Sequence, residues 1–164
     1  LIKLVQRRPN GDRRIVRLLS QGDLVGLESL NGQVADHEAI TMDHVKVCRI
    51  PRSVINSLQR DTPNLHNALI QRWQKALSGA DDWITRLSTG NAKERVARLL
   101  LLLDENSTDD CFFLPTREDM GAMLGITTES ASKATAEFRR KDWLKPLSQN
   151  RAWIDTAELL QQFD

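Results

Sequence analysis

The sequence has few of the features that place a protein in a specialised class. It has only two cysteines, Cys48 and Cys111, too few for a disulfide framework, which indicates a reducing compartment. Its densest apolar run, 99–103, is far shorter than the roughly 20 residues that a membrane span requires. No segment has the basic, apolar and small-residue order of a signal peptide. We therefore expect a cytoplasmic protein with no membrane association.

An excess of charge of one sign is also missing. The 164 residues include 23 Lys and Arg and 22 Asp and Glu, which gives a net charge of +1. This balance neither predicts nor excludes a nucleic-acid partner, so any basic surface must be local. With 40% apolar and 27% charged residues, the composition is typical of a globular protein of one or two domains and excludes a disordered or collagen-like chain.

The first fifty residues predict a small β domain. Short apolar-rich runs typical of strands occur at 1–8, 14–19, 24–27 and 39–50. Asn10-Gly11 is a strong hairpin signal because both residues tolerate positive φ. A short helix is expected at 51–62. Four short strands bury little by themselves, and the sequence opens inside an apolar run at Leu1. We therefore expect that an early part of this domain precedes Leu1.

A long amphipathic helix is predicted from Pro63, which suits a first helical turn. Apolar residues recur three or four positions apart along it, as on a packed helix face. They are Leu65, Leu69, Trp73, Ala76, Ala80, Trp83 and Leu87. This stripe would suit packing inside its own domain, but its length and the small residue Gly79 favour a dimer seam, where two backbones approach closely.

The last part of the chain contains the most specific pattern. After a helix capped by Asn91, a short strand is expected at 111–114 and a helix that begins after Thr116. Gly121 and Gly125 stand where a helix-turn-helix needs a small residue and a turn residue with positive φ. A second helix follows at about 128–141. The runs 143–145 and 152–154 predict a two-stranded wing with Trp143 and Trp153 in the core.

The alternative for this pattern is an ordinary pair of helices in a helical core. Against that alternative, the second helix begins with short polar and charged groups suited to base edges and phosphates, Thr127, Thr128, Glu129, Ser130, Ser132 and Lys133.

On these residues the chain resembles the Crp/Fnr family of bacterial transcription regulators, and the Fnr-like branch most closely. The similar segments are 22–26, 47–51, 91–97 and, most specific, 116–133. The resemblance covers nearly the whole chain and implies an α+β fold. It implies part of a β-roll sensor domain, a jelly roll like that of cyclic-nucleotide-binding domains, at 1–62. A dimerisation helix would follow at 63–88 and a winged helix-turn-helix at 89–164.

The resemblance also implies residue roles. The base-reading positions of the family fall on Thr128, Glu129, Ser132 and Lys133, and the phosphate-contacting positions on Thr116, Arg117, Thr127 and Ser130. A dimer interface is implied along the long helix, at Leu69, Trp73, Ala76, Ala80, Trp83 and Leu87. The family usually has Arg where Lys133 stands, and lysine lacks the planar fork, so we expect weaker or differently aimed guanine readout.

The signal that the β domain senses is not specified by the sequence. Members that bind cyclic nucleotides grip the phosphate with an Arg-Ser/Thr-Ala triplet, whereas the corresponding stretch is Ala35-Asp36-His37. We therefore expect no cyclic nucleotide to bind. Cys48 aligns with an iron–sulfur ligand of oxygen-sensing members, but such a cluster needs four thiolates, and the other three would lie before Leu1. Cys48 also suits a small buried apolar position. No metal site is predicted.

Three classes of function come into question. The resemblance favours a homodimeric, sequence-specific regulator that binds double-stranded DNA at an inverted repeat and contacts RNA polymerase. The alternative is an effector-binding or protein-interaction module whose winged helix docks a protein partner. An enzyme is not expected, since the sequence has no Gly-rich phosphate loop, nucleophile elbow or paired-histidine zinc motif.

Overall fold

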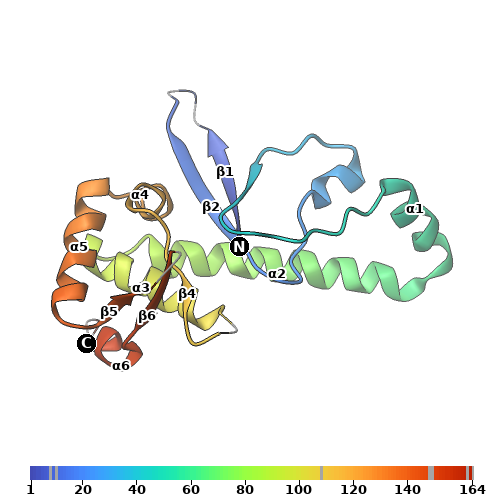
Figure 1. Cartoon of the computed structure of the whole chain (residues 1–164). Coiled ribbons are helices and arrows are strands. Elements are labelled where there is room, and N and C mark those ends of the chain that lie inside the picture. The colour runs from blue at the N-terminus through green and yellow to red at the C-terminus, as the bar shows by residue number, and fades with distance from the viewer. Residues whose placement is uncertain (8, 10, 108, 148–149, 162, 164) are drawn as a thin grey trace.

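The computed structural model describes all residues except 8, 10, 108, 148–149, 162 and 164. Helix α2 (Pro63–Leu87) forms the long axis of the molecule (Figure 1). α1 (Arg52–Asp61) lies beside the N-terminal end of α2, whereas the first sheet stands toward the C-terminal half of α2, and the remaining α-helices gather near its C-terminal end. None of the described helices is long and apolar enough to cross a membrane.

The first sheet has three antiparallel strands in the order β2-β1-β3. They are β1 (Ile2–Arg7), β2 (Arg13–Leu19) and β3 (Glu38–Thr41). The strands predicted at 1–8 and 14–19 are therefore confirmed. The expected turn between them includes Asn10, which lies outside the described residues.

Two strand predictions in this half are wrong. Residues 24–27 form no strand; Gly26 has a φ of 81°, outside the β region, and a 3₁₀ helix, η1 (Leu27–Asn31), follows it. The strand expected at 39–50 ends at Thr41. Thr41 pairs with Ile2 of β1, and the described residues 42–50 form no strand.

The helices begin and end where the local signals indicated. α2 has Thr62 as its N-cap and proline in its first turn. α3 (Ala92–Glu105) begins after Asn91, whose side chain accepts a hydrogen bond from the backbone N–H of Glu94 at 3.0 Å. One face of α3 is buried and includes Val96, Leu99, Leu100 and Leu103.

The C-terminal part has the elements of a winged helix-turn-helix. They are β4 (Phe112–Phe113), α4 (Arg117–Leu124), α5 (Thr128–Arg140), β5 (Leu144–Pro146), β6 (Arg151–Ile154) and α6 (Thr156–Leu160). The wing is a three-stranded antiparallel sheet in the order β4-β6-β5, because β4 joins the two expected strands. Part of the β5–β6 connection, 148–149, lies outside the described residues.

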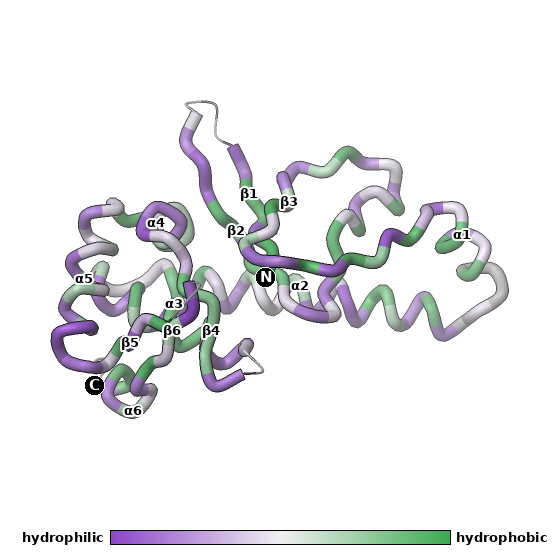
Figure 2. The backbone as a smooth tube through the Cα atoms, in the orientation of Figure 1, coloured by the Kyte–Doolittle hydropathy of each residue, from purple (hydrophilic) through white to green (hydrophobic). Residues whose placement is uncertain are grey.

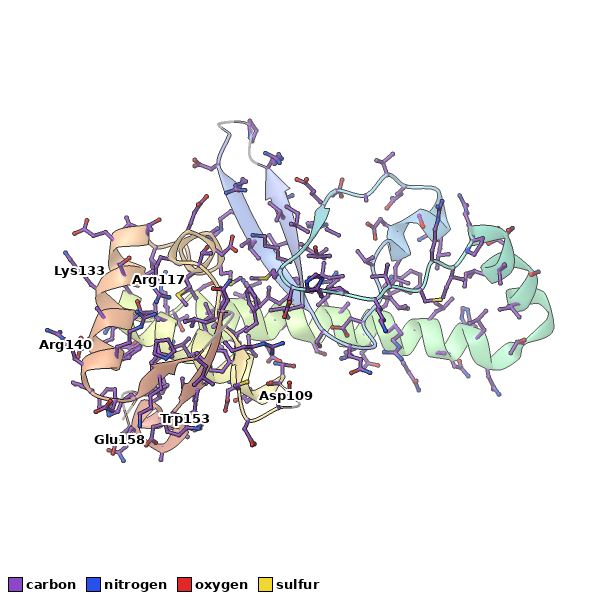
Figure 3. The ribbon with its side chains drawn as sticks, viewed as in Figure 1. Asp109, Arg117, Lys133, Arg140, Trp153 and Glu158 are labelled. Atoms are coloured by element: carbon purple, nitrogen blue, oxygen red, sulfur yellow. The ribbon has the colours of Figure 1, made fainter. Side chains whose placement is uncertain are left out.

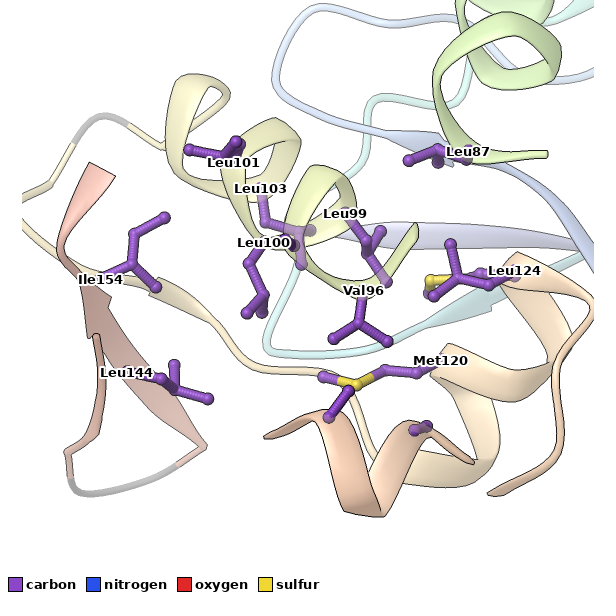
Figure 4. Packing of buried hydrophobic residues seen from close by; sticks show 14 of the residues in the cluster. Leu87, Val96, Leu99, Leu100, Leu101, Leu103, Met120, Leu124, Leu144 and Ile154 are labelled. Carbon is purple, nitrogen blue, oxygen red and sulfur yellow. The ribbon is translucent and has the colours of Figure 1, made fainter. Parts of the chain in front are cut away.

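A single hydrophobic core joins the first sheet to the C-terminal part. Val5 of β1 and Ile15 of β2 belong to the same buried cluster as Leu87, Val96, Met120 and Leu124. In Figure 4 the labelled side chains of α2, α3 and α4 face one another beside the strands of the first sheet. The position of α4 is therefore tied to β1 and β2 by apolar packing.

The two tryptophans of the wing differ in their surroundings. Trp143 is partly buried and packs against the core, with 6.1 Å between the ring centroids of Trp143 and Phe138. Trp153 is 36% exposed, so its prediction as a core residue is wrong. It stands between Ala152 and Ile154, which are both buried, and strand alternation therefore turns it outward.

Candidate nucleic-acid interface

The steep turn between α4 and α5 depends on two glycines. Gly125 ends α4 with a φ of 66°, a left-handed conformation that other residues adopt at a cost. A Cβ added to Gly121 would lie 2.8 Å from the backbone oxygen of Ile126, too close for a real side chain. The two helices approach closely at Gly121, as the sequence predicted.

Short polar side chains hold the starts of both helices. The hydroxyl oxygen of Thr116 accepts a hydrogen bond from the backbone N–H of Asp119 at 3.1 Å. That of Thr127 accepts one from the N–H of Ser130 at 3.1 Å and lies 2.9 Å from the Ser130 hydroxyl. Two of the predicted phosphate-contacting residues, Thr116 and Thr127, are thus N-caps, and Ser130 is hydrogen-bonded to the second of them; their role toward DNA stays a prediction.

The outer face of α5 is polar and exposed. Ala131, Ala134 and Phe138 bury the inner face against the core. The predicted base-reading residues lie on the other side, with Thr128, Glu129 and Lys133 exposed and Ser132 partly buried. Figure 3 shows Lys133 pointing away from the molecule. The arrangement presents hydrogen-bonding groups on a convex helix, a shape suited to a major groove.

Glu129 and Lys133 are paired with each other. Their side chains, 75% and 77% exposed, meet across one turn with 2.7 Å between the Glu129 Oε1 and Lys133 Nζ atoms. This contact lies within α5 and leaves both side chains exposed, so both remain accessible to a ligand that approaches the helix.

Arg117 has a surrounding that the sequence did not reveal. It is partly buried, and its guanidinium lies 3.5 Å from the sulfur of Met120. Burial, and then the positive charge of Arg139, lower the pKa of Arg117 below its ordinary value. The charge of Arg139 on α5 thus acts on Arg117 of α4, and an anion bound near both would offset this repulsion. The basic run 139–141 at the end of α5 was the only sequence signal for Arg139.

The stripe predicted as a dimer seam lies mostly against the chain itself. Leu87 is fully buried and Leu69 is 7% exposed, so neither has surface left for a partner, and the prediction is wrong for these two residues. Ala76, Ala80 and Trp83 are partly buried. The packing of α2 against β2 and α3 decides this face, and helical spacing alone does not specify it.

A second apolar stripe on α2 is open to solvent. Its members are Ile70, Trp73, Leu77 and Ile84, with exposed fractions of 46%, 41%, 66% and 62%. They follow the spacing of a dimer seam. Figure 2 shows hydrophobic and hydrophilic positions alternating along α2. Trp73 is the member that this stripe shares with the predicted one. We call these four residues the outer stripe.

The sensor half offers no assembled metal site in the part of the chain that the structure describes. Cys48 is exposed, contrary to a buried apolar position. No group of three or more His, Cys, Asp or Glu side chains among the described residues could hold a metal ion. Ala35 and Asp36, in the stretch corresponding to the phosphate-gripping triplet, are exposed.

Two families match the chain, one in each half. Residues 94–163 match the family described as the Crp-like helix-turn-helix domain. Residues 1–62 match the cyclic nucleotide-binding domain. The matched ranges cover the winged helix with most of α3, and the first sheet with α1.

Similar proteins have both halves. The fumarate and nitrate reduction regulatory protein of Vibrio cholerae is 27% identical over 157 residues, 92% of this chain and 63% of that protein. A probable transcriptional activator of Rhizobium leguminosarum is 30% identical over 146 residues, 85% of this chain and 60% of that protein. The chain thus spans somewhat over half the length of these relatives.

Solved structures share the fold. That of FixK2 from Bradyrhizobium japonicum superposes with a TM-score of 0.81 at 24% identity, covering 98% of this chain and 81% of that one. A CRP-family transcriptional regulator from Thermus thermophilus superposes with a TM-score of 0.82 at 23% identity, covering 98% of this chain and 82% of that one. The likeness confirms the expected fold of β-roll strands, long helix and winged helix-turn-helix.

Proposed function

The chain belongs to the Crp/Fnr family of transcription regulators, and from this premise we propose that it binds double-stranded DNA as a homodimer and regulates transcription. The observation that carries the proposal is the exposed polar face of α5, backed by a buried apolar face. A helix that docked a protein would expose apolar side chains there, so this face favours DNA over the protein-docking alternative.

Base readout is assigned to four residues of α5: Thr128, Glu129, Ser132 and Lys133. Glu129 would accept a hydrogen bond from a cytosine amino group, and Lys133 would donate to guanine O6 or N7. Because these two side chains pair with each other, their ion pair must open when they reach base edges. The exposed pair costs little to open, since such pairs contribute about 0–1 kcal/mol.

Phosphate contacts are assigned to Arg117 and to the starts of the two helices. Thr116 caps α4, whereas Thr127 and Ser130 lie at the start of α5, where backbone N–H groups and the helix dipole attract anions. Arg139 joins this set because its charge lies close enough to Arg117 to lower the pKa of that guanidinium. A phosphate between the two arginines would relieve their repulsion.

The dimer is assigned to the outer stripe of α2. Pairing of Ile70, Trp73, Leu77 and Ile84 with their copies would cover the exposed apolar surface of this helix. A two-fold dimer places two α5 helices in successive major grooves, about one helical turn apart. The DNA site is then an inverted repeat.

The remaining roles follow the family. Residues 1–62 are assigned to the sensor, 63–88 to the dimer helix and 89–164 to DNA binding. RNA polymerase is the proposed protein partner, and the cytoplasm the proposed place of action. We expect no catalytic activity. We also expect no binding of cyclic AMP, because residues 35–37 contain no arginine to hold its phosphate.

Selection of bound duplexes from a random pool tests the proposal. The purified protein should enrich an inverted repeat with half-sites about one helical turn apart. The same protein with Lys133→Ala, Glu129→Ala and Ser132→Ala is the control and should enrich no common sequence. A wild-type protein that retains no duplex above the background of random DNA would contradict DNA binding and move the protein-docking alternative ahead.

A further inference from the structure

The β1–β2 hairpin of the sensor half is attached to the first helix of the helix-turn-helix. Lys3 Nζ lies 2.6 Å and 2.8 Å from the two carboxylate oxygens of Asp119. Both side chains are largely buried, at 13% and 15% exposure. The apolar contacts of Val5 and Ile15 continue this attachment into the shared core.

A second ion pair lies at the turn end of the hairpin. Arg13 of β2 binds Glu118 of α4, and these side chains are 43% and 70% exposed. The guanidinium of Arg14 lies over the turn, since a Cβ added to Gly125 would come within 2.6 Å of its Nη1 atom. Cations of the sensor half thus reach both acidic residues of the first turn of α4.

These two acidic residues serve folding and oppose DNA binding. Carboxylates in the first turn of a helix are stabilised by the positive end of the helix dipole. Glu118 and Asp119, however, directly follow Arg117, at the end of α4 assigned above to phosphate contact. Two uncompensated negative charges beside a phosphate would repel it, because the interaction acts over about 10 Å at ordinary ionic strength.

Resting on the proposed function, we infer that Lys3 and Arg13 are positioning residues for DNA binding. They neutralise Asp119 and Glu118, so that the hairpin of the sensor half completes the DNA-facing surface of α4. Release of the hairpin would uncover both carboxylates and weaken DNA binding. The docked arrangement seen in the structure is therefore the DNA-binding one.

The two pairs make different contributions. Lys3 and Asp119 are largely buried, so removing one partner leaves a buried charge and destabilises the fold. Arg13 and Glu118 are exposed, and pairs of this kind contribute little to stability. An effect of Arg13 on DNA binding can therefore be measured without an effect on folding, and the test uses this pair.

The experiment is a double-mutant cycle with Arg13→Gln, Glu118→Gln and the double variant, titrated against a selected inverted repeat and a scrambled duplex. Arg13→Gln should raise Kd for both duplexes about five- to tenfold, the size expected for a unit charge several ångströms from phosphates. The double variant should return to within about twofold of wild type, because no carboxylate remains to be neutralised. Thermal unfolding should be the same for all four proteins.

Arg7→Gln is the matched control. Arg7 lies on the same hairpin, opposite Arg13, but pairs at 3.0 Å with Glu38 of β3, on the far side of the sheet from β2. The variant removes the same charge and uncovers a carboxylate away from α4, so its Kd should stay within about twofold of wild type.

Two outcomes would overturn the inference. If Arg13→Gln binds both duplexes as wild type does, the hairpin does not contribute to DNA binding. If the double variant stays as weak as Arg13→Gln, Arg13 contacts phosphate directly and does not act through Glu118. Either result leaves wild-type DNA binding intact and is distinct from a failure of the proposed function, in which wild type binds neither duplex.

Discussion

Glu129 and Lys133 form an ion pair across one turn of α5, with 2.7 Å between their charged atoms and both side chains mostly in solvent. The pair joins an acceptor and a donor on the face assigned to base readout. In the free protein each satisfies the other, so non-specific DNA meets a locally neutral surface. A specific site offers partners to both groups, whereas scrambled DNA does not, so the two side chains contribute to specificity more than to affinity.

Lys133→Ala tests this relationship. We expect a loss of about 1–3 kcal/mol at the specific site and little change on scrambled DNA, because alanine cannot reach a base edge whereas the phosphate-binding groups are unchanged. Titration of both duplexes by fluorescence anisotropy measures the two losses. Lys46→Ala, which removes an exposed lysine of the sensor half, is the control. Equal losses on both duplexes would make Lys133 a phosphate anchor.

Arg117→Ala should weaken specific and scrambled DNA binding alike, because a phosphate contact carries no sequence information. The slope of log K against log salt should fall by about one for each phosphate that a subunit no longer neutralises. The measurement is a titration at several salt concentrations, with Arg49→Ala, an exposed arginine of the sensor half, for comparison. An unchanged salt slope would show that Arg117 does not reach the backbone.

Leu77→Glu should shift the protein from dimer to monomer without unfolding it. Leu77 is 66% exposed in the single chain, so the new charge is in water in the monomer and buried only in the dimer. Sedimentation velocity gives the state of assembly, and Gln71→Glu, also on α2 but off the outer stripe, is the control. Trp83→Glu should instead destabilise the chain, because Trp83 packs against its own core. An unchanged Leu77→Glu dimer would place the interface elsewhere.

Local signals in the sequence located the starts of α3, α4 and α5 correctly, whereas η1 and α6 were not predicted. Asn91, Thr116 and Thr127 accept hydrogen bonds from the third residue of the helix that each precedes, and Gly125 ends α4 in the left-handed region. Such signals depend only on residues a few positions apart, and the sequence contains them in full. The core of the helix-turn-helix was therefore predictable in detail.

Longer-range relationships were not predictable. β3 pairs with β1, more than thirty residues before it in the chain, and the buried face of α2 depends on β2 and α3. Leu69 and Ile70 each begin a stripe with seven-residue spacing, so periodicity alone could not tell the buried stripe from the exposed one. The approach of Lys3 to Asp119 joins residues that no sequence motif connects.

Glu137→Gln should lower the free energy of unfolding at neutral pH, and this loss should be smaller in acid. The pKa of Glu137 is lowered from 4.5, chiefly by a hydrogen bond from Lys93. Burial raises this pKa, and a smaller contribution from Lys141 lowers it further. A carboxylate whose pKa is lower in the folded state stabilises the fold when the pH is above its unfolded-state pKa. This stabilisation is lost as the pH falls through the folded-state pKa. Urea unfolding should show a difference of about 0.5–1 kcal/mol at pH 7 that narrows below pH 4. A difference independent of pH would exclude this linkage.

Gly121→Ala and Gly79→Ala should have opposite effects on stability. A Cβ at Gly121 would lie 2.8 Å from the backbone oxygen of Ile126, so the turn must move, at a cost of about 1–3 kcal/mol. The movement displaces the start of α5, and DNA binding should fall even under conditions where the variant is folded. Gly79 lies inside α2 with no atom within 4 Å of the added Cβ, so alanine there should stabilise the helix by about 0.5–1 kcal/mol. Urea unfolding and sedimentation of both variants check this. If Gly79→Ala weakens self-association, two backbones meet at Gly79, and the dimer seam lies nearer the stripe predicted from helical spacing than the outer stripe proposed from the structure.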